Sequence, residues 1–328
     1  MKIASFNAQR FGLKKALDPR VLSTLIKIVS RYDIIVILEV VDVSGASVKL
    51  LLKELNRANS AHHYALQISS RLGRNRYKEQ FLFLYRDDVV DLTDCYQYED
   101  NQTDDPDAFA REPYILHFKP RNTVLKNIVL IPVRISPYDT ENELDELYEV
   151  FLFVKDKWKT DNIMILGDFC ADGLYVTQKQ MKALRIRSDK NFHWLIGDDM
   201  DTTSDTSKDH TYDRILVYGD DMLAAVVPKS AKPFDFHKEF HMTEEMALEV
   251  SDHYPVEVEL RKASPFWTTD GSRTCHTPEE SVIRADTNQL NIEVVKLQKE
   301  NLLLEQEKLQ LQISLLKQHL LRLQRSKK

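Results

Sequence analysis

The stretch IIVILEV, residues 34–40, places a single carboxylate, Glu39, near the end of an otherwise apolar run. A short apolar run rich in β-branched residues is typical of a buried strand. Comparable runs are FLFLY (81–85), NIVLIPV (127–133), NIMILGD (162–168) and DRILVYG (213–219). They alternate with helical patterns such as VLSTLIKIVSRY (21–32) and VKLLLKELNRA (48–58). This alternation predicts an α/β layered domain.

A change of composition near residue 262 divides the chain of 328 residues. The chain is 43% hydrophobic, which is ample for one core of about 250 residues, so residues 1–262 are expected to form a globular domain. Small, polar and turn-forming residues follow, and they indicate a linker over residues 263–285. Residues 286–328 contain neither Gly nor Pro and predict a helix.

This C-terminal helix has the heptad pattern of a coiled coil. Val295, Leu302, Leu309, Leu316 and Leu323 recur every seven residues. A second apolar stripe repeats at the same spacing, so the helix has apolar surface on more than one side. We expect self-association or a heterotypic coiled coil through residues 286–328. The alternative is that the helix folds back on the globular domain.

Charge, cysteine content and hydropathy limit the classes of function. Residues 1–280 carry 36 Lys and Arg against 46 Asp and Glu, a net charge of −10, which disfavours nonspecific nucleic-acid binding. Three scattered cysteines, Cys95, Cys170 and Cys275, support neither a disulfide framework nor a zinc site. The sequence contains no apolar run of about 18 residues, the length that would predict a membrane span. Met1 is not followed by a signal-peptide pattern, so we expect a cytoplasmic or nuclear protein. Secretion is the alternative if Met1 begins a processed or truncated form.

Polar residues border the apolar runs at four places. Asn7, Glu39 and Asp168 stand at the ends of expected strands, and Asp252 and His253 precede another. Each residue alone is more often a helix cap or a salt-bridge partner. Several carboxylates leaving buried strands are costly unless they meet a cation, so together they suggest a shared pocket for a divalent ion. With Asp213, His253 suggests an Asp–His general base.

The segments around these residues resemble the deoxyribonuclease I family, nearest to its deoxyribonuclease gamma branch. The resemblance covers residues 2–262 and is carried by SSRLGRNRYKEQFLFLYR (69–86), AREPY (110–114), GDF (167–169), WLIGDDMDTT (194–203), YDRI (212–215) and VSDHYPVE (250–257). It implies a four-layer sandwich of two packed mixed β-sheets flanked by helices, with the active site at one edge.

The resemblance also implies the roles of individual residues. A pocket for Mg²⁺ or Mn²⁺ and the scissile phosphate is implied at Asn7, Glu39, Asp168 and Asp252. His253 is implied as the general base, oriented by Asp213, and Glu79 as the partner of a second histidine. Tyr77 and Arg111 match residues that approach DNA. Structural Ca²⁺ ions are implied at Asp107, the Phe109 carbonyl, Glu112, Asp201 and Thr203.

The chain departs from the family at several of these positions. Arg134, in IPVRISPYD (131–139), stands where the family has its second catalytic histidine. An arginine does not release a proton near neutral pH, so it is no general acid, and we expect it to pair with Glu79 or with a phosphate. Cys170 replaces an asparagine that contacts phosphate, and Val41 replaces a cationic contact to DNA. Gly173 and His210 occupy the family's disulfide positions.

These departures predict a deoxyribonuclease I-like domain with severely reduced or absent DNA cleavage, which keeps a divalent-ion pocket and weak binding of double-stranded DNA. One alternative is a working Mg²⁺/Ca²⁺-dependent endonuclease in which His210 or a metal-bound water supplies the proton. Another alternative is a non-catalytic interaction scaffold.

Overall fold

The computed structural model describes residues 1–99, 108–172 and 175–263. All of them lie in the first of the two units into which the chain divides, Met1–Pro265. The predicted coiled coil over residues 286–328, nearly all of the predicted linker, Asp107 and Gly173 lie outside the described residues. In the described part of the chain, no helix combines the length and the apolar character needed to cross a membrane.

Two six-stranded mixed sheets form the centre of the domain. The first has the strand order β11-β12-β1-β2-β4-β3. Its strands, in chain order, are β1 (Lys2–Phe11), β2 (Ile34–Val40), β3 (Tyr64–Ile68), β4 (Gln80–Arg86), β11 (Lys232–Pro233) and β12 (Val256–Glu259). Strands β1 and β2 are parallel, and the other pairings are antiparallel.

The second sheet has the order β5-β6-β7-β8-β10-β9. Its strands are β5 (Val90–Gln97), β6 (Tyr114–Pro120), β7 (Ile128–Arg134), β8 (Ile163–Asp168), β9 (Phe192–Trp194) and β10 (Asp213–Tyr218). Here β7 and β8 form the parallel pair. Each sheet therefore has one central parallel pair, and hydrogen bonds from Asn7 to Asp168 and from Arg134 to Glu39 join the strand ends of the two pairs.

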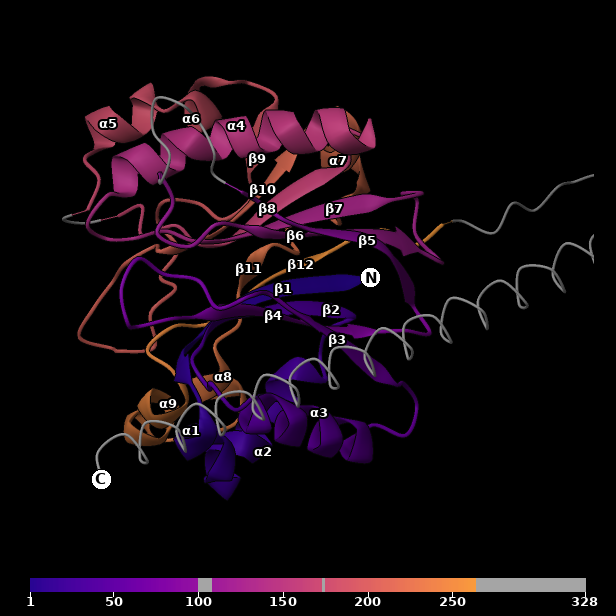
Figure 1. Ribbon diagram of the computed structural model, residues 1–328, viewed down its shortest axis with the longest axis vertical. Helices are drawn as coiled ribbons and strands as arrows, with labels where there is room; N and C mark the ends of the chain where they lie inside the picture. Colours follow the sequence, from indigo (N-terminus) through magenta and orange to yellow (C-terminus); the bar gives the residue numbers. More distant parts are fainter. Residues whose placement is uncertain (100–107, 173–174, 264–328) are drawn as a thin grey trace, which may run out of the picture. The chain divides into compact units, whose positions relative to one another are not determined.

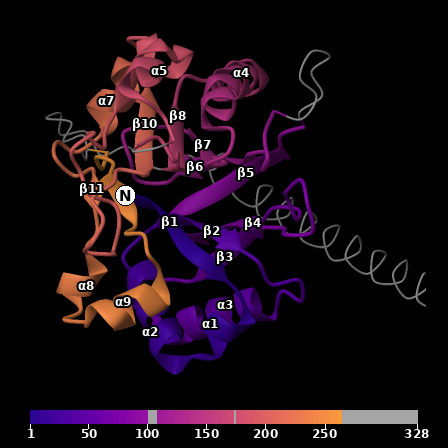
Figure 2. The same ribbon diagram turned by 90° about the vertical axis from the view of Figure 1, so that its left-hand side faces the viewer.

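Helices cover the outer face of each sheet (Figures 1 and 2). The first sheet is covered by α1 (Leu13–Leu17), α2 (Pro19–Val29), α3 (Ala46–Ala58), α8 (Phe236–Glu239) and α9 (Glu244–Val250). The second is covered by α4 (Thr140–Trp158), α5 (Gln178–Ala183), α6 (Arg185–Ser188) and α7 (Asp220–Ala225). The predicted layers of the sandwich are confirmed for the described residues.

The burial of β2 explains why its sequence is apolar throughout. All seven of its residues are buried. Val36 and Leu38 belong to the core between the sheets, together with Phe83 of β4. Ile35 and Ile37 belong to the core beneath α2 and α3. Because side chains alternate between the faces of a strand, a strand covered on both faces needs apolar residues at nearly every position.

Candidate active site at one edge of the sandwich

The strand ends gather the predicted polar residues at one edge of the sandwich. Glu39 is the penultimate residue of β2, and Arg134 and Asp168 are the last residues of β7 and β8. In the sheet register, Asp168 is paired with Arg134 on one side and with Asp213, the first residue of β10, on the other. Asn7 and Asp213, which are 206 positions apart in sequence, both contact this edge.

Asn7 holds the two central carboxylates in place. Its side-chain Nδ2 donates hydrogen bonds to Oε1 of Glu39 at 3.1 Å and to Oδ2 of Asp168 at 3.0 Å. Its own Oδ1 accepts from the backbone N–H of Gln9 at 2.9 Å. Asn7, Glu39 and Asp168 are all buried, so these polar contacts offset the cost of removing the groups from water. Asn7 acts in this structure as a donor between Glu39 and Asp168.

The backbone around these residues is strained. Gln9, Arg10, Glu39 and Cys170 have φ values of 45°, 57°, 58° and 47°, in the left-handed region that residues other than glycine rarely adopt. The pairing of β1 with β2 shifts register after Asn7, and the pairing of β2 with β4 shifts before Val40. Such irregularities redirect side chains at sheet edges and concentrate at functional sites.

The Asp–His pair predicted from the sequence is formed. Nδ1 of His253 lies 2.6 Å from Oδ2 of Asp213. Burial acts to lower the pKa of His253, but the charge and hydrogen bond of Asp213, together with the charges of Asp168 and Asp252, outweigh it and raise this pKa to about 10. Burial raises the pKa of Asp213 to about 6. The other ring nitrogen, Nε2, points toward the acidic pocket, 4.0 Å from Asp168 and 3.9 Å from Asp252. The orientation, with Nδ1 bound to a carboxylate and Nε2 facing the pocket, is that of an Asp–His general base. A pKa of about 10, however, keeps the ring protonated at neutral pH, so the role as a base stays a prediction.

Arg134 has other partners than the one predicted. Its Nε and Nη2 donate to Oε1 of Glu39 at 3.0 and 2.7 Å, and Nη1 lies 3.4 Å from Oδ2 of Asp168. Glu79 is instead paired with Arg111, at 2.6 and 2.9 Å. The expectation that Arg134 pairs with Glu79 is therefore wrong. The reason is the register of β7 against β8, which sets the Arg134 backbone beside Asp168.

Charge balance follows from these contacts. Burial acts to raise the pKa of Glu39, but the Arg134 guanidinium and the amide of Asn7 outweigh it and hold this pKa below its ordinary value. Asp168 is likewise held below its ordinary pKa, because Arg134 and His253 outweigh its burial. The pKa of Arg134 is raised well above its ordinary value, since the surrounding negative charges outweigh its burial. Glu39, Asp168 and Arg134 are all charged at neutral pH.

Cys170 packs against Asp168. Its backbone N–H donates to Oδ1 of Asp168 at 3.1 Å, and its Sγ lies 3.4 Å from the same oxygen and from the carbonyl of Ile135. The side chain is buried, and burial raises the pKa of the thiol well above its ordinary value. The sulfur is a neutral, weakly donating group at the position that the resemblance assigns to a phosphate contact.

A divalent ion was predicted between Asn7, Glu39, Asp168 and Asp252, and these residues do come together. The oxygens of Glu39 and Asp168, however, already accept from donors, whereas Oδ1 of Asp252 is buried without a hydrogen-bond partner. Oε1 of Glu39 accepts from Asn7 and Arg134, and Oε2 accepts from the backbone N–H of Arg10 at 3.0 Å. In the part of the chain that the structure describes, no three His, Cys, Asp or Glu side chains are arranged to hold a metal ion. The pocket as arranged does not fit a divalent ion.

The remaining predicted residues lie around this centre. Tyr77 is 38% exposed, with the Arg10 guanidinium 5.5 Å from its ring centre, and Arg111 is half-buried in its pair with Glu79. Thr203 donates through its backbone and its hydroxyl to Asp201 at 2.9 and 2.6 Å. Phe109 is buried, and the backbone carbonyl of Glu112 accepts from Gln97. The structural Ca²⁺ positions and the DNA contacts stay predictions.

Sequence reasoning missed two residues that shape the site. The backbone of Arg10 holds Glu39, as described above, and Ser251 bridges the chain segments. The Ser251 hydroxyl donates to the carbonyl of Asn7 at 2.6 Å and accepts from the backbone N–H of His253 at 3.1 Å. Ser251 stands inside the segment VSDHYPVE, but the roles of both residues arise from the irregular pairing of β1 and from tertiary contact.

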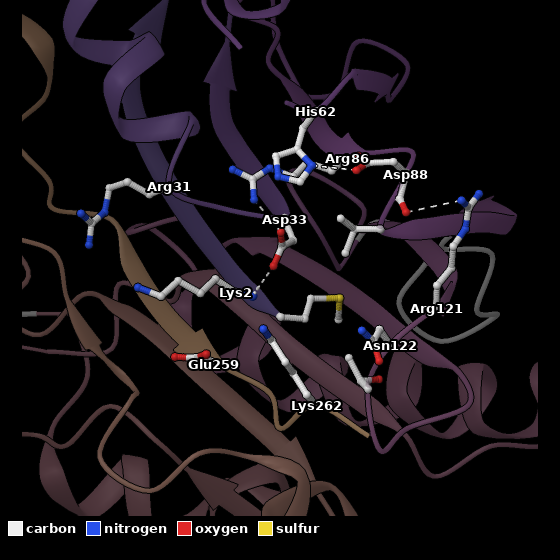
Figure 3. Close-up of a pocket in the computed structure, with 13 residues that line it drawn as sticks. Lys2, Arg31, Asp33, His62, Arg86, Asp88, Arg121, Asn122, Glu259 and Lys262 are labelled. Carbon is white, nitrogen blue, oxygen red and sulfur yellow. Dashed lines mark hydrogen bonds and ion pairs between the residues drawn. The ribbon is translucent and has the colours of Figure 1, made fainter. Parts of the chain in front are cut away.

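A separate pocket of about 480 Å³ lies at the other end of the strands (Figure 3). Lys2 at the start of β1, Arg86 at the end of β4 and Glu259 at the end of β12 line it. Its charges are partly paired, as Arg86 with Asp33 at 2.8 Å and Arg121 with Asp91. None of the predicted site residues lines it.

Comparison with known proteins agrees with this geometry. The profile of the Endonuclease/Exonuclease/phosphatase family matches residues 4–253. Deoxyribonuclease gamma of Homo sapiens is 42% identical over 282 residues, which cover 86% of this chain and 92% of that protein. Deoxyribonuclease-1 of Rattus norvegicus is 45% identical over 263 residues, which cover 80% and 92%.

Solved structures show the same fold at low identity. The crystal structure of D. rerio TDP2 complexed with single strand DNA product matches with a TM-score of 0.52 and 16% identity, over 79% of this chain and 97% of that one. The strand order and the Asp213–His253 pair agree with these relatives. The chain therefore belongs to the deoxyribonuclease I family within the endonuclease/exonuclease/phosphatase superfamily.

Proposed function

We propose that this chain is a deoxyribonuclease I-like protein whose cleavage of DNA is severely reduced or absent. Weak binding of double-stranded DNA is retained in this proposal, through Tyr77 and Arg111. The observation that carries it is the state of Arg134. An arginine bound to two buried carboxylates stands where a nuclease of this family needs a group that protonates the leaving oxygen.

The expected loss of rate is large. Removing a general acid costs about 10²–10⁴ in rate, and removing an oriented phosphate donor costs about 10²–10³. The two losses do not simply add, because both groups act on one transition state. Glu79, the carboxylate that would orient an acid, is already engaged by Arg111. Little competitive turnover remains under this proposal.

A working endonuclease is the second candidate, and the intact Asp213–His253 pair favours it. His210, the proton source considered for this alternative, stacks on Tyr212 with ring centres 4.9 Å apart and lies 3.4 Å from Asp172. Tyr212 in turn lies 6.2 Å from His253. His210 is therefore on the side of the base, which does not suit a group that protonates the leaving oxygen on the opposite side.

Nicking of supercoiled plasmid in Mg²⁺ plus Ca²⁺ tests the proposal. We expect the wild-type chain to nick at least about a hundredfold more slowly than Arg134→His/Cys170→Asn, the lower end of general-acid catalysis. The Asn substitution suits the backbone, because Cys170 has φ of 47° and Asn tolerates this region better than most residues.

Two controls define the result. Cys95→Asn, at an exposed cysteine, should leave nicking as in the wild type. Adding His253→Asn to the double variant should abolish the gain, because the base is then missing. If the wild-type chain nicks plasmid as fast as the double variant, Arg134 does not reduce cleavage, and the working-endonuclease candidate replaces the proposal.

The C-terminal segment completes the proposal. Residues 286–328 are proposed to associate with a second copy or with another coiled-coil protein, by the heptad pattern described above. Deleting them should lower the mass measured by light scattering and leave the melting temperature of the nuclease-like domain unchanged. An unchanged mass would remove this part of the proposal.

A further inference from the structure

We propose that Arg134 is an internal cation that takes the place of a divalent metal ion between Glu39 and Asp168. This inference concerns metal binding alone, and its test measures binding and not cleavage of DNA. It follows from the contacts of the guanidinium, from the lone pairs that these contacts use and from the burial of the three groups.

The guanidinium of Arg134 lies between the two carboxylates. Two of its nitrogens lie at 3.0 and 2.7 Å from one oxygen of Glu39, and the third lies 3.4 Å from Oδ2 of Asp168. The same third nitrogen, Nη1, also donates to the carbonyl of Ile135 at 2.9 Å. One positively charged group thus bridges the two carboxylates, as a metal ion would.

Each oxygen of Glu39 and Asp168 already accepts a hydrogen bond. Oε1 of Glu39 accepts from Asn7 and from two nitrogens of Arg134, and Oε2 accepts from Arg10. Oδ1 of Asp168 accepts from the backbone of Cys170, and Oδ2 accepts from Asn7. A metal ion needs free lone pairs on such oxygens. Oε1 of Glu39, with three donors, has no lone pair left, so an ion that bridges Oε1 of Glu39 and Oδ2 of Asp168 would have to displace Arg134 first.

The three charged side chains are largely shielded from water. The side chains of Arg134, Glu39 and Asp168 are only 15%, 9% and 2% exposed. A metal ion placed between Glu39 and Asp168 would lie beside the Arg134 guanidinium, and the repulsion between the two cations is weakly screened there. Metal binding therefore requires Arg134 to leave two charge-assisted hydrogen bonds and move out. Breaking two hydrogen bonds between charged groups costs enough free energy to weaken metal binding by at least about a hundredfold.

Binding of Mn²⁺ to the full chain tests the inference. Free Mn²⁺ is measured by electron paramagnetic resonance as MnCl₂ is titrated into wild type, Arg134→Met and Arg134→Lys. We expect Arg134→Met to bind one additional ion at least about a hundredfold more tightly than any site in this pocket of the wild type. Arg134→Lys should bind it weakly, because the ammonium still carries the compensating charge.

Matched controls locate the ion. Arg86→Met removes another arginine that is 15% exposed and paired with a carboxylate, Asp33, and should leave Mn²⁺ binding as in the wild type. Adding Asp168→Asn to Arg134→Met should remove the gained ion. Because Arg134→Met leaves two buried carboxylates unpaired, Arg134→Gln and the rise of melting temperature with Mn²⁺ provide a second route to the same answer.

The inference is overturned if wild type and Arg134→Met bind Mn²⁺ in this pocket with dissociation constants within about threefold of each other. It is also overturned if the gained ion persists in the Arg134→Met/Asp168→Asn variant, since the ion is then elsewhere. Both readouts are independent of cleavage, so a failed nicking experiment and a failed binding experiment remain distinct results.

Discussion

Replacing Arg134 by Met tests the ion pair at the centre of the site through stability. The substitution keeps most of the apolar stem and removes the guanidinium. Glu39 then loses two hydrogen bonds, of 3.0 and 2.7 Å, and Asp168 loses its nearest cation at 3.4 Å. Because both carboxylates are buried, the variant should lose about 3–5 kcal/mol of unfolding free energy, the cost of breaking a buried pair.

Thermal unfolding in EDTA measures this loss without a contribution from metal ions. For a domain of this size the expected fall in melting temperature is roughly 6–20 °C. The double variant Glu39→Gln/Arg134→Met should be less destabilised than the sum of the single variants, with a coupling of about 2 kcal/mol. A loss below about 1 kcal/mol, or strictly additive effects, would show that the Arg134–Glu39 pair is not formed.

Three further predictions concern other buried groups. Burial raises the pKa of Glu143 from its ordinary 4.5 to about 7, so the folded state keeps a proton that the unfolded state releases. The contribution of Glu143 to wild-type stability should therefore fall by about 3 kcal/mol as pH rises through this window, and Glu143→Gln should reduce the loss of stability between pH 4.5 and 7.5 by that amount in urea unfolding. Gly167→Ala should cost at least about 3 kcal/mol, because Gly167 has φ of 145° and a Cβ there would lie 2.1 Å from the Val133 carbonyl. A circular-dichroism melt within 2 °C of the wild type, about the shift for 1 kcal/mol, would contradict this. Cys170 should resist iodoacetamide in the native protein while exposed Cys95 reacts, since burial raises the pKa of the Cys170 thiol; peptide mapping that finds both alkylated equally would refute it.

Much of the fold follows from local sequence patterns. The apolar runs at residues 34–40 and 162–168 become β2 and β8, because strands covered on both faces need apolar residues throughout. Polar residues at the ends of those runs also predict where the site lies. Parallel neighbours end at the same edge of a sheet, so Asn7 lies near Glu39 in one sheet and Arg134 near Asp168 in the other, and the packing of the two sheets brings these pairs together.

The partners of charged residues were decided only by the tertiary structure. Local sequence could not show that Arg134 pairs with Glu39, 95 positions away, and leaves Glu79 to Arg111. That choice depends on the shift of strand register near Asn7 and on the left-handed backbone of Glu39, which aims this carboxylate at the end of β7. Sequence determines which residues reach the edge, because apolar periodicity is local. Which oxygen meets which nitrogen depends on ångström-scale positions that are set by packing of the whole sandwich.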